Sequence, residues 1–487
     1  MIVLNNALDY VKQHRARFVN ELMELIRIPS VSTDAERTND LKACAQWLAI
    51  HLKRIGLEHV EVVPTEGHPV VYADWLRSPT LPTVLIYGHY DVQPADPLDE
   101  WEFPPFEPAV RANILYGRGA SDDKGQFLIH VKALEAFLGT SGTLPVNVKC
   151  LFEGEEEIGS SHLIQFIGWN QRALAAELAV ISDTSMLGAN RPALTYSLRG
   201  QLALEVEVRG PKRDLHSGKF GGAVHNPLQA LCEIIAQLHD RDGRVAIPGF
   251  YDRVRDWSEL EREDMRRHGP RDGQILRDAE TETGWGELGY SLYERITVRP
   301  SLSINGMSGG YEGVGSKAVI PSRAHAKLSF RLVADQEPRE IENLFRPHIA
   351  QITPTTVKSV VRTSQSSKPV MIDRRHPVLR AAALAYRKAF GSKPVFLRSG
   401  GSIPVVNAFQ ELLGVPTVLM GFGLPDDRIH APNEKFHLEN FFKGIATSIS
   451  FLAEIGARGK SIAGWVPKQV DRVTYLQRPM RSPCYDY

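Results

Sequence analysis

Cysteine, net charge and long apolar runs are what this sequence has least of. Its four cysteines, Cys44, Cys150, Cys232 and Cys484, lie far apart and form no CxxC pair. That spacing excludes a disulfide framework and a zinc knuckle. The 57 basic residues balance 57 acidic residues, which argues against a broad nucleic-acid-binding surface. Because the sequence shows no signal-peptide core and no membrane-length apolar run, we expect a soluble, cytoplasmic protein that binds neither nucleic acid nor membrane.

What the sequence does contain is a series of acidic motifs, each placed directly after an apolar run. The run at 83–87 leads into His89 and Asp91. Side chains two residues apart on a strand point the same way, so Asp91 can reach the metal-binding region and fix the tautomer of the His89 imidazole. Two further acidic groups follow at 122–123 and 153–157. A histidine and several carboxylates at strand ends indicate a metal centre.

The first part of the chain alternates helical and strand patterns. Apolar periodicity predicts helices at 40–57, 125–138 and 161–176 and short, buried strands at 70–75, 84–87, 146–152 and 178–181. This alternation predicts an α/β fold, with a parallel-rich mixed sheet and helices on its faces. Ligands of open α/β sheets gather at the carboxyl ends of the strands. His89, Glu156, Glu157 and Asp183 each follow an apolar run closely, so we expect them at that edge.

The next segment carries a different pattern, with two alternating strands and an amphipathic helix at 202–208, 324–333 and 227–238. This pattern predicts a second, antiparallel α+β domain at 197–376. Beyond it, helix and strand patterns resume, and His430 follows a predicted strand. We therefore expect a discontinuous first domain, in which 1–196 and 377–487 close around the insertion.

Seven short motifs in a fixed order carry a resemblance to a known family. They are GHYDVQP, GRGASDDKG, EGEEEIGS, ISD, DLHSG, GGSIP and IHAPNE, and together they span most of the chain. In these motifs the chain resembles the M20 metallopeptidases, specifically their dipeptidase, carnosinase-like branch. The resemblance implies a catalytic α/β domain interrupted by a lid domain that often dimerises, and hence a homodimer. It also implies hydrolysis of dipeptides or short peptides that carry a free carboxylate.

The same resemblance implies a site that holds two divalent metal ions in each chain. One ion would be bound by His89 and Asp183 and the other by Glu157 and His430, with Asp122 shared between them. Histidine and carboxylate ligands without a thiolate suit zinc, and they also suit manganese or cobalt. We therefore expect a zinc centre, with manganese and cobalt as the alternatives.

Two further acidic residues have roles that the resemblance implies. Asp91 resembles the carboxylate that orients His89, and Glu156 resembles the general base that takes a proton from water. The acidic run does not by itself show which glutamate is the base, because Glu155 directly precedes Glu156. The spacing Glu-Glu-x-Gly-Ser favours Glu156 as the base and Glu157 as the ligand.

Residues of the inserted domain and of the GGSIP motif resemble the family's substrate-binding groups. His216 resembles the lid histidine that stabilises the oxyanion, often from the partner subunit. Arg331 resembles the lid arginine that binds a substrate carboxylate, and Ser402 with Gly401 resembles the opposite wall of that pocket. Two positions depart from the family's pattern and leave the substrate preference open: Ser399, where relatives often have an acidic residue, and Ala318, where some have a hydroxyl.

Other interpretations of these residues stay open at this point. His216 can be an ordinary turn residue, Arg331 a surface strand residue, and the glutamate run the acidic first turn of a helix. Within the same chemistry, the alternative function is an N-acyl amino acid deacylase or carboxypeptidase-like amidohydrolase. From a different class, the alternative is a non-catalytic peptide binder. A lost base or ligand would favour that alternative, and the sequence keeps every one of them.

Overall fold

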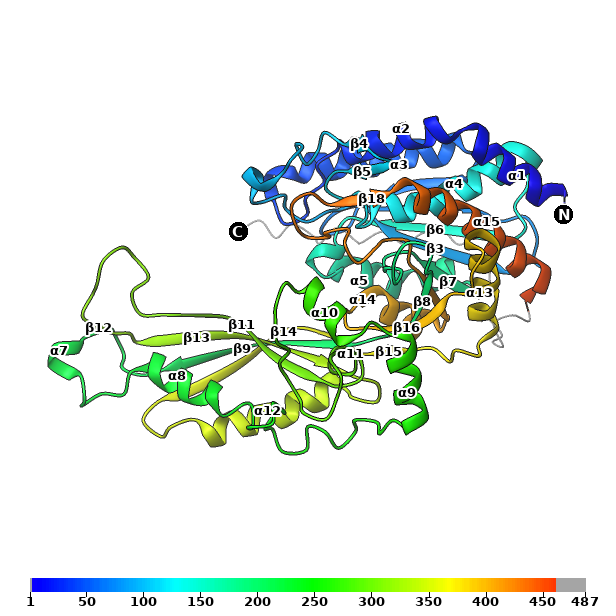
Figure 1. Cartoon of the computed structure of the whole chain (residues 1–487). Coiled ribbons are helices and arrows are strands. Elements are labelled where there is room, and N and C mark those ends of the chain that lie inside the picture. The colour runs from blue at the N-terminus through cyan, green and yellow to red at the C-terminus, as the bar shows by residue number, and fades with distance from the viewer. Residues whose placement is uncertain (1, 461–487) are drawn as a thin grey trace. The chain divides into compact units, whose positions relative to one another are not determined.

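The computed structural model describes residues 2–460, which form two compact units (Figure 1). Within that range the first unit comprises 2–196, 372–397 and 404–460, and the second comprises 197–371 and 398–403. The segment expected as the insertion, 197–376, differs from the second unit in two places. Residues 372–376 pack with the first unit, whereas 398–403, which the sequence assigned to the first domain, pack with the second.

The first unit is built on a mixed sheet with the strand order β1, β2, β6, β3, β7, β17, β8. Their bounds are β1 Glu58–Val63, β2 Val70–Trp75, β6 Asn147–Glu153, β3 Thr83–His89, β7 Leu178–Ile181, β17 Thr417–Met420 and β8 Ala193–Leu198. The central pairs β6–β3, β3–β7 and β7–β17 are parallel, and the flanking pairs are antiparallel. Because β3 and β7 are buried along their whole length, their apolar runs are nearly continuous. The predicted α/β class with a mixed sheet is confirmed.

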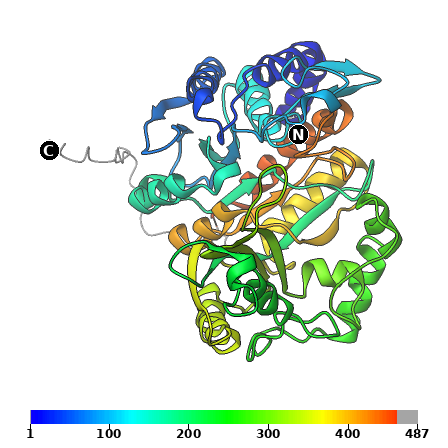
Figure 2. The same cartoon turned by 90° about the vertical axis from the view of Figure 1, so that its left-hand side faces the viewer.

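Helices lie on both faces of this sheet (Figures 1 and 2). They are α1 Ile2–Gln13, α2 Arg15–Ile26, α3 Thr38–Arg54, α4 Lys124–Ser141, α5 Ser161–Trp169, α6 Gln171–Leu174, α13 Pro377–Phe390, α14 Pro404–Ala408 and α15 Leu438–Arg458. Short turns of helix are η1 Ala35–Arg37, η2 Leu98–Glu100, η3 Glu156–Ile158 and η4 Phe409–Leu413, and a small sheet joins β4 Ala109–Arg111, β5 Ile114–Tyr116 and β18 Lys435–His437. Between residues 2 and 460, no helix has the length and apolarity to span a bilayer.

Helix ends in the first unit follow local sequence signals. α13 begins with Pro377, the His376 side chain accepts the Val378 N–H, and Gly391 ends the helix in the left-handed region at φ 74°. The helix predicted over 161–176 is instead two helices, α5 and α6. The chain leaves the helical path at Asn170, whose side-chain amide donates to the Phe166 carbonyl.

The second unit has a four-stranded antiparallel sheet in the order β11, β13, β9, β14. Its strands are β11 Ser301–Gly309, β13 Arg323–Leu332, β9 Gly200–Arg209 and β14 Lys358–Ser367, and shorter strands are β10 Leu215–His216, β12 Val319–Ile320, β15 Val370–Met371 and β16 Val395–Ser399, the last spanning both units. Its helices are α7 Ser217–Phe220, α8 Pro227–Ala236, α9 Glu259–His268, α10 Asp272–Asp278, α11 Leu292–Thr297 and α12 Pro338–Ile352. Alternate residues of β9 and β13 face α8 and α12 to form the core.

A buried ionic cluster joins α2, α3 and α4 in the first unit. The Lys132 ammonium is fully buried, contacts Glu21, and donates to Glu135 at 3.0 Å and to His51 Nε2 at 2.8 Å. Glu21 also accepts from Arg54 at 2.7 Å. Burial, together with the charge of Lys132, lowers the pKa of His51 to about 2, so this histidine is neutral and accepts the lysine N–H. Lys132 is therefore a buried counter-charge for both carboxylates, which the more exposed Arg17 and Arg54 also contact.

Lys132→Met is expected to lower the free energy of unfolding by about 3–5 kcal/mol, because it removes a fully buried counter-charge and leaves Glu21 and Glu135 with only the more exposed Arg17 and Arg54. Chemical denaturation followed by circular dichroism measures this change. Lys12→Met is the matched control, because Lys12 forms only an exposed pair with Asp9 at 2.8 Å and should have little effect. Equal stability losses in the two variants would contradict the prediction.

Candidate metal centre

Parallel strand pairing brings the predicted site residues of the first unit to one edge of the sheet. β3 ends at His89, which is in register with Glu153 at the end of β6. On its other side β3 pairs in parallel with β7, which ends two residues before Asp183. The segments that follow these strands therefore leave the sheet at the same edge, as expected for a ligand site in an α/β fold.

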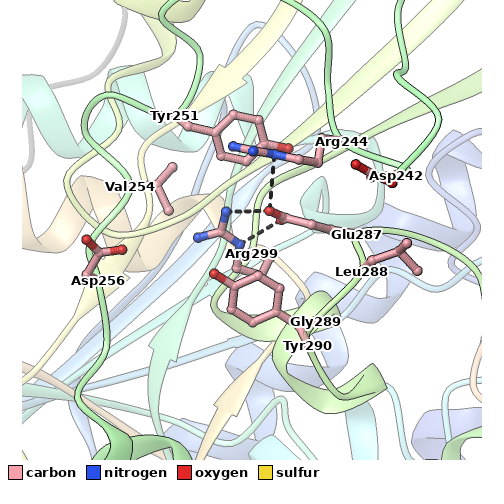
Figure 3. Close-up of a pocket in the computed structure, with 10 residues that line it drawn as sticks. All are labelled: Asp242, Arg244, Tyr251, Val254, Asp256, Glu287, Leu288, Gly289, Tyr290 and Arg299. Carbon is pink, nitrogen blue, oxygen red and sulfur yellow. Dashed lines mark hydrogen bonds and ion pairs between the residues drawn. The ribbon is translucent and has the colours of Figure 1, made fainter.

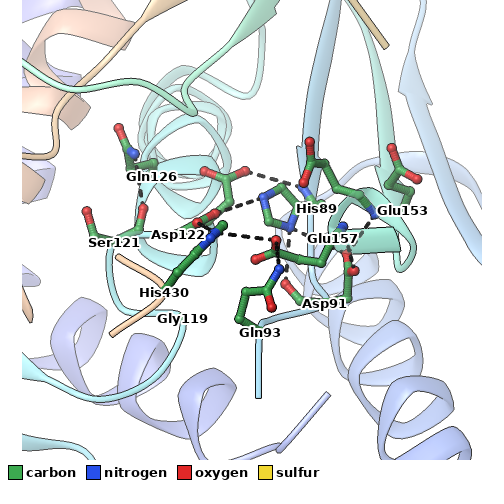
Figure 4. A network of polar contacts seen from close by, with 12 residues as sticks. His89, Asp91, Gln93, Gly119, Ser121, Asp122, Gln126, Glu153, Glu157 and His430 are labelled. Carbon is green, nitrogen blue, oxygen red and sulfur yellow. Dashed lines mark hydrogen bonds and ion pairs between the residues drawn. The ribbon is translucent and has the colours of Figure 1, made fainter. Parts of the chain in front are cut away.

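Five of these residues form two overlapping groups with metal-ligand chemistry, and Figure 4 labels four of them, His89, Asp122, Glu157 and His430. One group is His89, Asp122 and Asp183, the other is Asp122, Glu157 and His430, and within each group the ligand atoms lie within 4.8 Å of one another. Asp122 belongs to both groups. Its Oδ1 lies 3.1 Å from His89 Nε2, and its Oδ2 lies 2.8 Å from His430 Nε2. Opposite oxygens of one carboxylate thus face the two histidines, which is the arrangement of a carboxylate that bridges two ions.

Asp91 makes hydrogen bonds with His89 and with the backbone of the turn at Glu156 and Glu157. The Nδ1–H of His89 donates to the Asp91 backbone carbonyl at 3.1 Å, and the Asp91 carboxylate lies 3.4 Å from the same nitrogen. The Asp91 carboxylate also accepts the backbone N–H groups of Glu156 and Glu157, at 3.2 and 3.1 Å. Both His89 and Asp91 are fully buried. A protonated Nδ1 leaves Nε2 free to bind a metal, which is the tautomer that a ligand histidine needs.

The acidic run places neighbouring glutamates in different surroundings. The Glu155 carboxylate accepts the backbone N–H of His68 at 2.9 Å and contacts the Nδ1 atom of His162 at 2.9 Å, so it is already engaged by structural partners. Glu156 starts the short turn η3, and Glu157 accepts a hydrogen bond from Gln93 Nε2 at 2.7 Å. The sequence reasoning missed the Gln93 contact, although Gln93 lies within the GHYDVQP motif.

The electrostatics of the site are dominated by buried negative charge. Burial raises the pKa of the Glu156 and Asp183 carboxyls well above their usual range, and neighbouring carboxylates add to the shift. For Asp122, burial is outweighed by the hydrogen bond with His430 and by the nearby His89, which lower its pKa. Hydrogen bonds with Asp122 and a second carboxylate raise the pKa of His430 to about 10. Such a concentration of carboxylates in a buried site is the environment that divalent cations neutralise.

Two atoms of the site test whether a metal fits. His89 Nε2 and Glu157 Oε1 are buried and have no hydrogen-bond partner among residues 2–460. When His89 is neutral with its proton on Nδ1, Nε2 and Asp122 Oδ1 are two lone-pair donors 3.1 Å apart. Buried polar atoms normally have a hydrogen-bond partner or an ion beside them. A cation bound between His89 Nε2 and Asp122 Oδ1 would give both of these atoms a partner. The residues present therefore fit divalent metal ions.

The remaining predicted residues lie in the second unit, in two separate places. His216 is exposed, and its Nδ1 accepts the Gly218 N–H at 3.0 Å, which makes Nε2 the donor atom of the neutral ring. Arg331 Nη1 donates to Ser402 Oγ at 2.9 Å and to Gln201 at 3.1 Å, and burial lowers the pKa of Arg331. Gly401 N–H donates to Ser399 Oγ at 3.1 Å, and Ala318 accepts the Ser217 N–H with its backbone carbonyl at 3.1 Å.

A pocket of about 600 Å³ in the second unit contains none of the predicted residues (Figure 3). Arg299 lies between Tyr251 and Tyr290, with its guanidinium carbon 5.2 and 4.5 Å from the ring centroids. It donates twice to Glu287 at 2.7 Å, and Arg244 stacks on Tyr251 at 4.5 Å and pairs with Glu287 at 3.5 Å. The two arginines that line this pocket thus pair with Glu287 and stack on tyrosines, as in a stabilising stack.

Comparisons with known proteins place the chain in a family. Residues 85–454 match the model of peptidase family M20/M25/M40. The chain is 32% identical over 469 residues to the Cys-Gly metallodipeptidase DUG1 of Candida albicans, covering 92% of this chain and 96% of that protein. The crystal structure of human carnosine dipeptidase 1 has a TM-score of 0.83 and 31% identity, covering 93% of this chain and 99% of that one. The M20 family metallo-carboxypeptidase Sso-CP2 from Sulfolobus solfataricus has a TM-score of 0.81 and 32% identity, covering 90% and 99%.

These matches extend over nearly the whole chain and both units. The resemblance read from the seven sequence motifs is thereby confirmed. Because the family model covers well over half of the sequence and relatives above 30% identity span most of it, the chain belongs to peptidase family M20/M25/M40 and is a metallopeptidase, an enzyme that hydrolyses peptide bonds.

Proposed function

We propose that the enzyme hydrolyses dipeptides or short peptides with a free carboxylate, using two divalent metal ions. The observation that carries this proposal is Asp122, whose two oxygens face His89 and His430 separately. His89 and Asp183 would hold one ion, Glu157 and His430 the other, and Asp122 both. Bound at these residues, the two ions would supply a water of lowered pKa and polarise the scissile carbonyl.

Glu156 is the residue that we assign to proton transfer. It takes a proton from the attacking water and delivers a proton to the leaving amine. Two features support this role over Glu155. The Asp91 carboxylate fixes the backbone of Glu156 through its N–H at 3.2 Å, and the Glu155 carboxylate is already bound by His68 and His162.

Substrate binding is assigned to residues of the second unit. Arg331 would bind the substrate carboxylate, with Ser402 and Gly401 beside it; its hydrogen bond to Ser402 Oγ at 2.9 Å supports a shared pocket. His216 would donate its Nε2–H to the oxyanion of the tetrahedral intermediate. The acceptor role of its Nδ1 toward Gly218 supports that tautomer.

The names of the relatives favour two substrate classes. Both the Cys-Gly metallodipeptidase of Candida albicans and human carnosine dipeptidase 1 support a dipeptidase. Sso-CP2, a metallo-carboxypeptidase at 32% identity, supports the alternative of a carboxypeptidase-like amidohydrolase. A panel of dipeptides, longer peptides and N-acyl amino acids, each followed by release of free amine, separates them. Faster turnover of N-acyl amino acids than of any dipeptide would favour the alternative.

Purified protein should contain two divalent ions per chain and lose its activity when they are removed, because both ligand groups depend on cations to balance their carboxylates. Elemental analysis measures the ions, and dialysis against a chelator followed by reconstitution measures the dependence. Reconstitution with zinc, manganese and cobalt in parallel identifies the ion that restores most activity. Full activity in the presence of chelator, with no metal found, would overturn the proposed function.

We also propose a homodimer in which His216 acts on the active site of the partner subunit. Its exposure, and its position outside the unit that holds the metal ligands, support this role. His216→Ala should lower kcat strongly and leave the metal content unchanged, because the lost contact forms only in the transition state. Sedimentation measures the oligomeric state, and a fully active monomer would reject the shared site.

Subunit mixing tests the trans arrangement directly. His216→Ala and Glu156→Gln subunits, each nearly inactive alone, should together recover up to about a quarter of wild-type activity. Random exchange makes half of the dimers mixed, and each mixed dimer holds one intact site of two. Verified exchange without any recovery would show that His216 acts within its own chain or not at all.

A further inference from the structure

A fully buried ion pair lies directly behind the metal ligands of the first unit. Glu434 is 0% exposed and Arg118 is 1% exposed, and Arg118 Nη1 donates to Glu434 Oε2 at 2.8 Å. Neither residue belongs to the predicted ligand groups. A buried pair of this kind gives little net stability compared with apolar residues of the same size, so its presence calls for a role beyond stability.

The Glu434 carboxylate accepts four hydrogen bonds, three of them from the backbone of the loop that carries Asp122. Oε1 accepts the N–H groups of Ser121 at 2.9 Å and of Asp122 itself at 3.0 Å. Oε2 accepts the Gly119 N–H at 2.8 Å in addition to Arg118. Glu434, four residues after His430, therefore binds the backbone of Asp122, the predicted ligand that the two groups share.

Arg118 extends the same contact to two more loops. Its Nη2 donates to the carbonyl of Ala431, next to His430, at 3.3 Å. The same nitrogen donates to the carbonyl of Pro94 at 3.1 Å, in the loop that follows His89 and Asp91. Three loops from distant parts of the sequence therefore meet at one pair of side chains, and each of them carries at least one predicted ligand or its orienting carboxylate.

We propose that the Arg118–Glu434 pair is the positioning element of the metal centre, which fixes the Asp122 and His430 loops at the separation that two ions sharing Asp122 require. This inference rests on the proposed two-metal function. The pair touches neither substrate nor metal and acts through the backbone of the ligands. Residues that orient ligands in this way typically change metal affinity or activity by about 10–100-fold when they are replaced.

The hydrogen-bond pattern specifies a carboxylate at position 434. Each of its two oxygens accepts from two donors. A glutamine has one acceptor oxygen only, so its NH₂ group would face two N–H donors whichever way the amide is turned. Glu434→Gln therefore preserves size and shape but breaks the hold on the Asp122 loop. It is the sharpest single substitution for testing the pair.

The test measures divalent-ion binding and turnover in the full-length protein. Metal-free wild type and Glu434→Gln are titrated with Mn²⁺ and with Zn²⁺ by calorimetry, and kcat and KM for a dipeptide are measured at limiting and at excess metal. We expect ion affinity to fall about 10–100-fold, with kcat lost at limiting metal and largely restored at excess metal. A merely structural defect would not be repaired by added metal.

Glu21→Gln is the matched control, because it also removes a buried carboxylate of the same unit from a buried cation. Its partners Lys132, Arg17 and Arg54 lie outside the three ligand loops, so it should lower stability without changing ion affinity. Equal affinity losses in both variants would overturn the inference, as would wild-type affinity and kcat in folded Glu434→Gln.

Arg118→Lys covers the case in which Glu434→Gln does not fold. A lysine keeps the positive charge, but its single ammonium cannot replace a fork that reaches Glu434, Pro94 and Ala431 together. It should lower ion affinity in the same direction, and unchanged affinity would overturn the inference. Wild type that binds two ions but cleaves no peptide would overturn the proposed function alone, whereas wild type that binds no ion would overturn both.

Discussion

Glu156→Gln is expected to retain both metal ions and to lower kcat by about 10²–10⁴-fold, because the amide cannot accept the proton of the attacking water. The substitution removes only the proton acceptor, and the Asp91 carboxylate still holds the backbone of the turn at residue 156 at 3.2 Å. Steady-state kinetics together with elemental analysis of the same sample measure both quantities. The metal content separates loss of a base from loss of a ligand.

The matched control for this substitution is Glu155→Gln, one residue away. Glu155 is bound by His68 and His162, so its replacement should affect local stability and leave kcat near the wild-type value. The opposite result, a large loss in Glu155→Gln and none in Glu156→Gln, would mean that the base is assigned one residue too late. The experiment therefore tests the register of the acidic run as well as the role of one carboxylate.

Asp122→Asn is expected to abolish the binding of both ions and to reduce kcat at least as far as Glu156→Gln. The reason is that Asp122 belongs to both ligand groups, and an amide offers one oxygen where two are needed. Glu157→Gln is the comparison, because Glu157 belongs to only one group and should cost one ion. Titration of the metal-free variants measures the number of ions bound. Two ions retained in Asp122→Asn would contradict a shared carboxylate.

The strand ends that build the site could be predicted because apolar runs mark buried strands. The run before His89 is β3 and the run before the glutamates is β6, and their parallel pairing follows from the alternation with helices. The choice of Glu156 over Glu155 came from spacing within one motif, and the contacts of Glu155 with His68 and His162 support it. The roles of these residues remain predictions, which the substitutions above test.

Other features could not be predicted because they depend on contacts between distant segments. Nothing in the local pattern shows that the Asp91 carboxylate accepts the Glu156 and Glu157 N–H groups, or that Glu434 accepts that of Asp122. No helix was predicted at 252–287, a stretch rich in acidic and basic residues, yet it contains α9 and α10. A capping box at the start of α9, between Ser258 and Glu261, was the signal that would have located it.

The order of the strands has a consequence for how the enzyme is made. β17 lies between β7 and β8 in the sheet, although it is synthesised long after both of them. His430 and Glu434 emerge later still, so a nascent chain that ends after the second unit lacks one member of the second ligand group and one partner of the buried ion pair. During translation such a chain lacks the strand between β7 and β8 and holds an incomplete set of the predicted metal ligands. Binding of both proposed ions would therefore require residues 430–434, and a chain released before them would lack a ligand that added metal cannot replace.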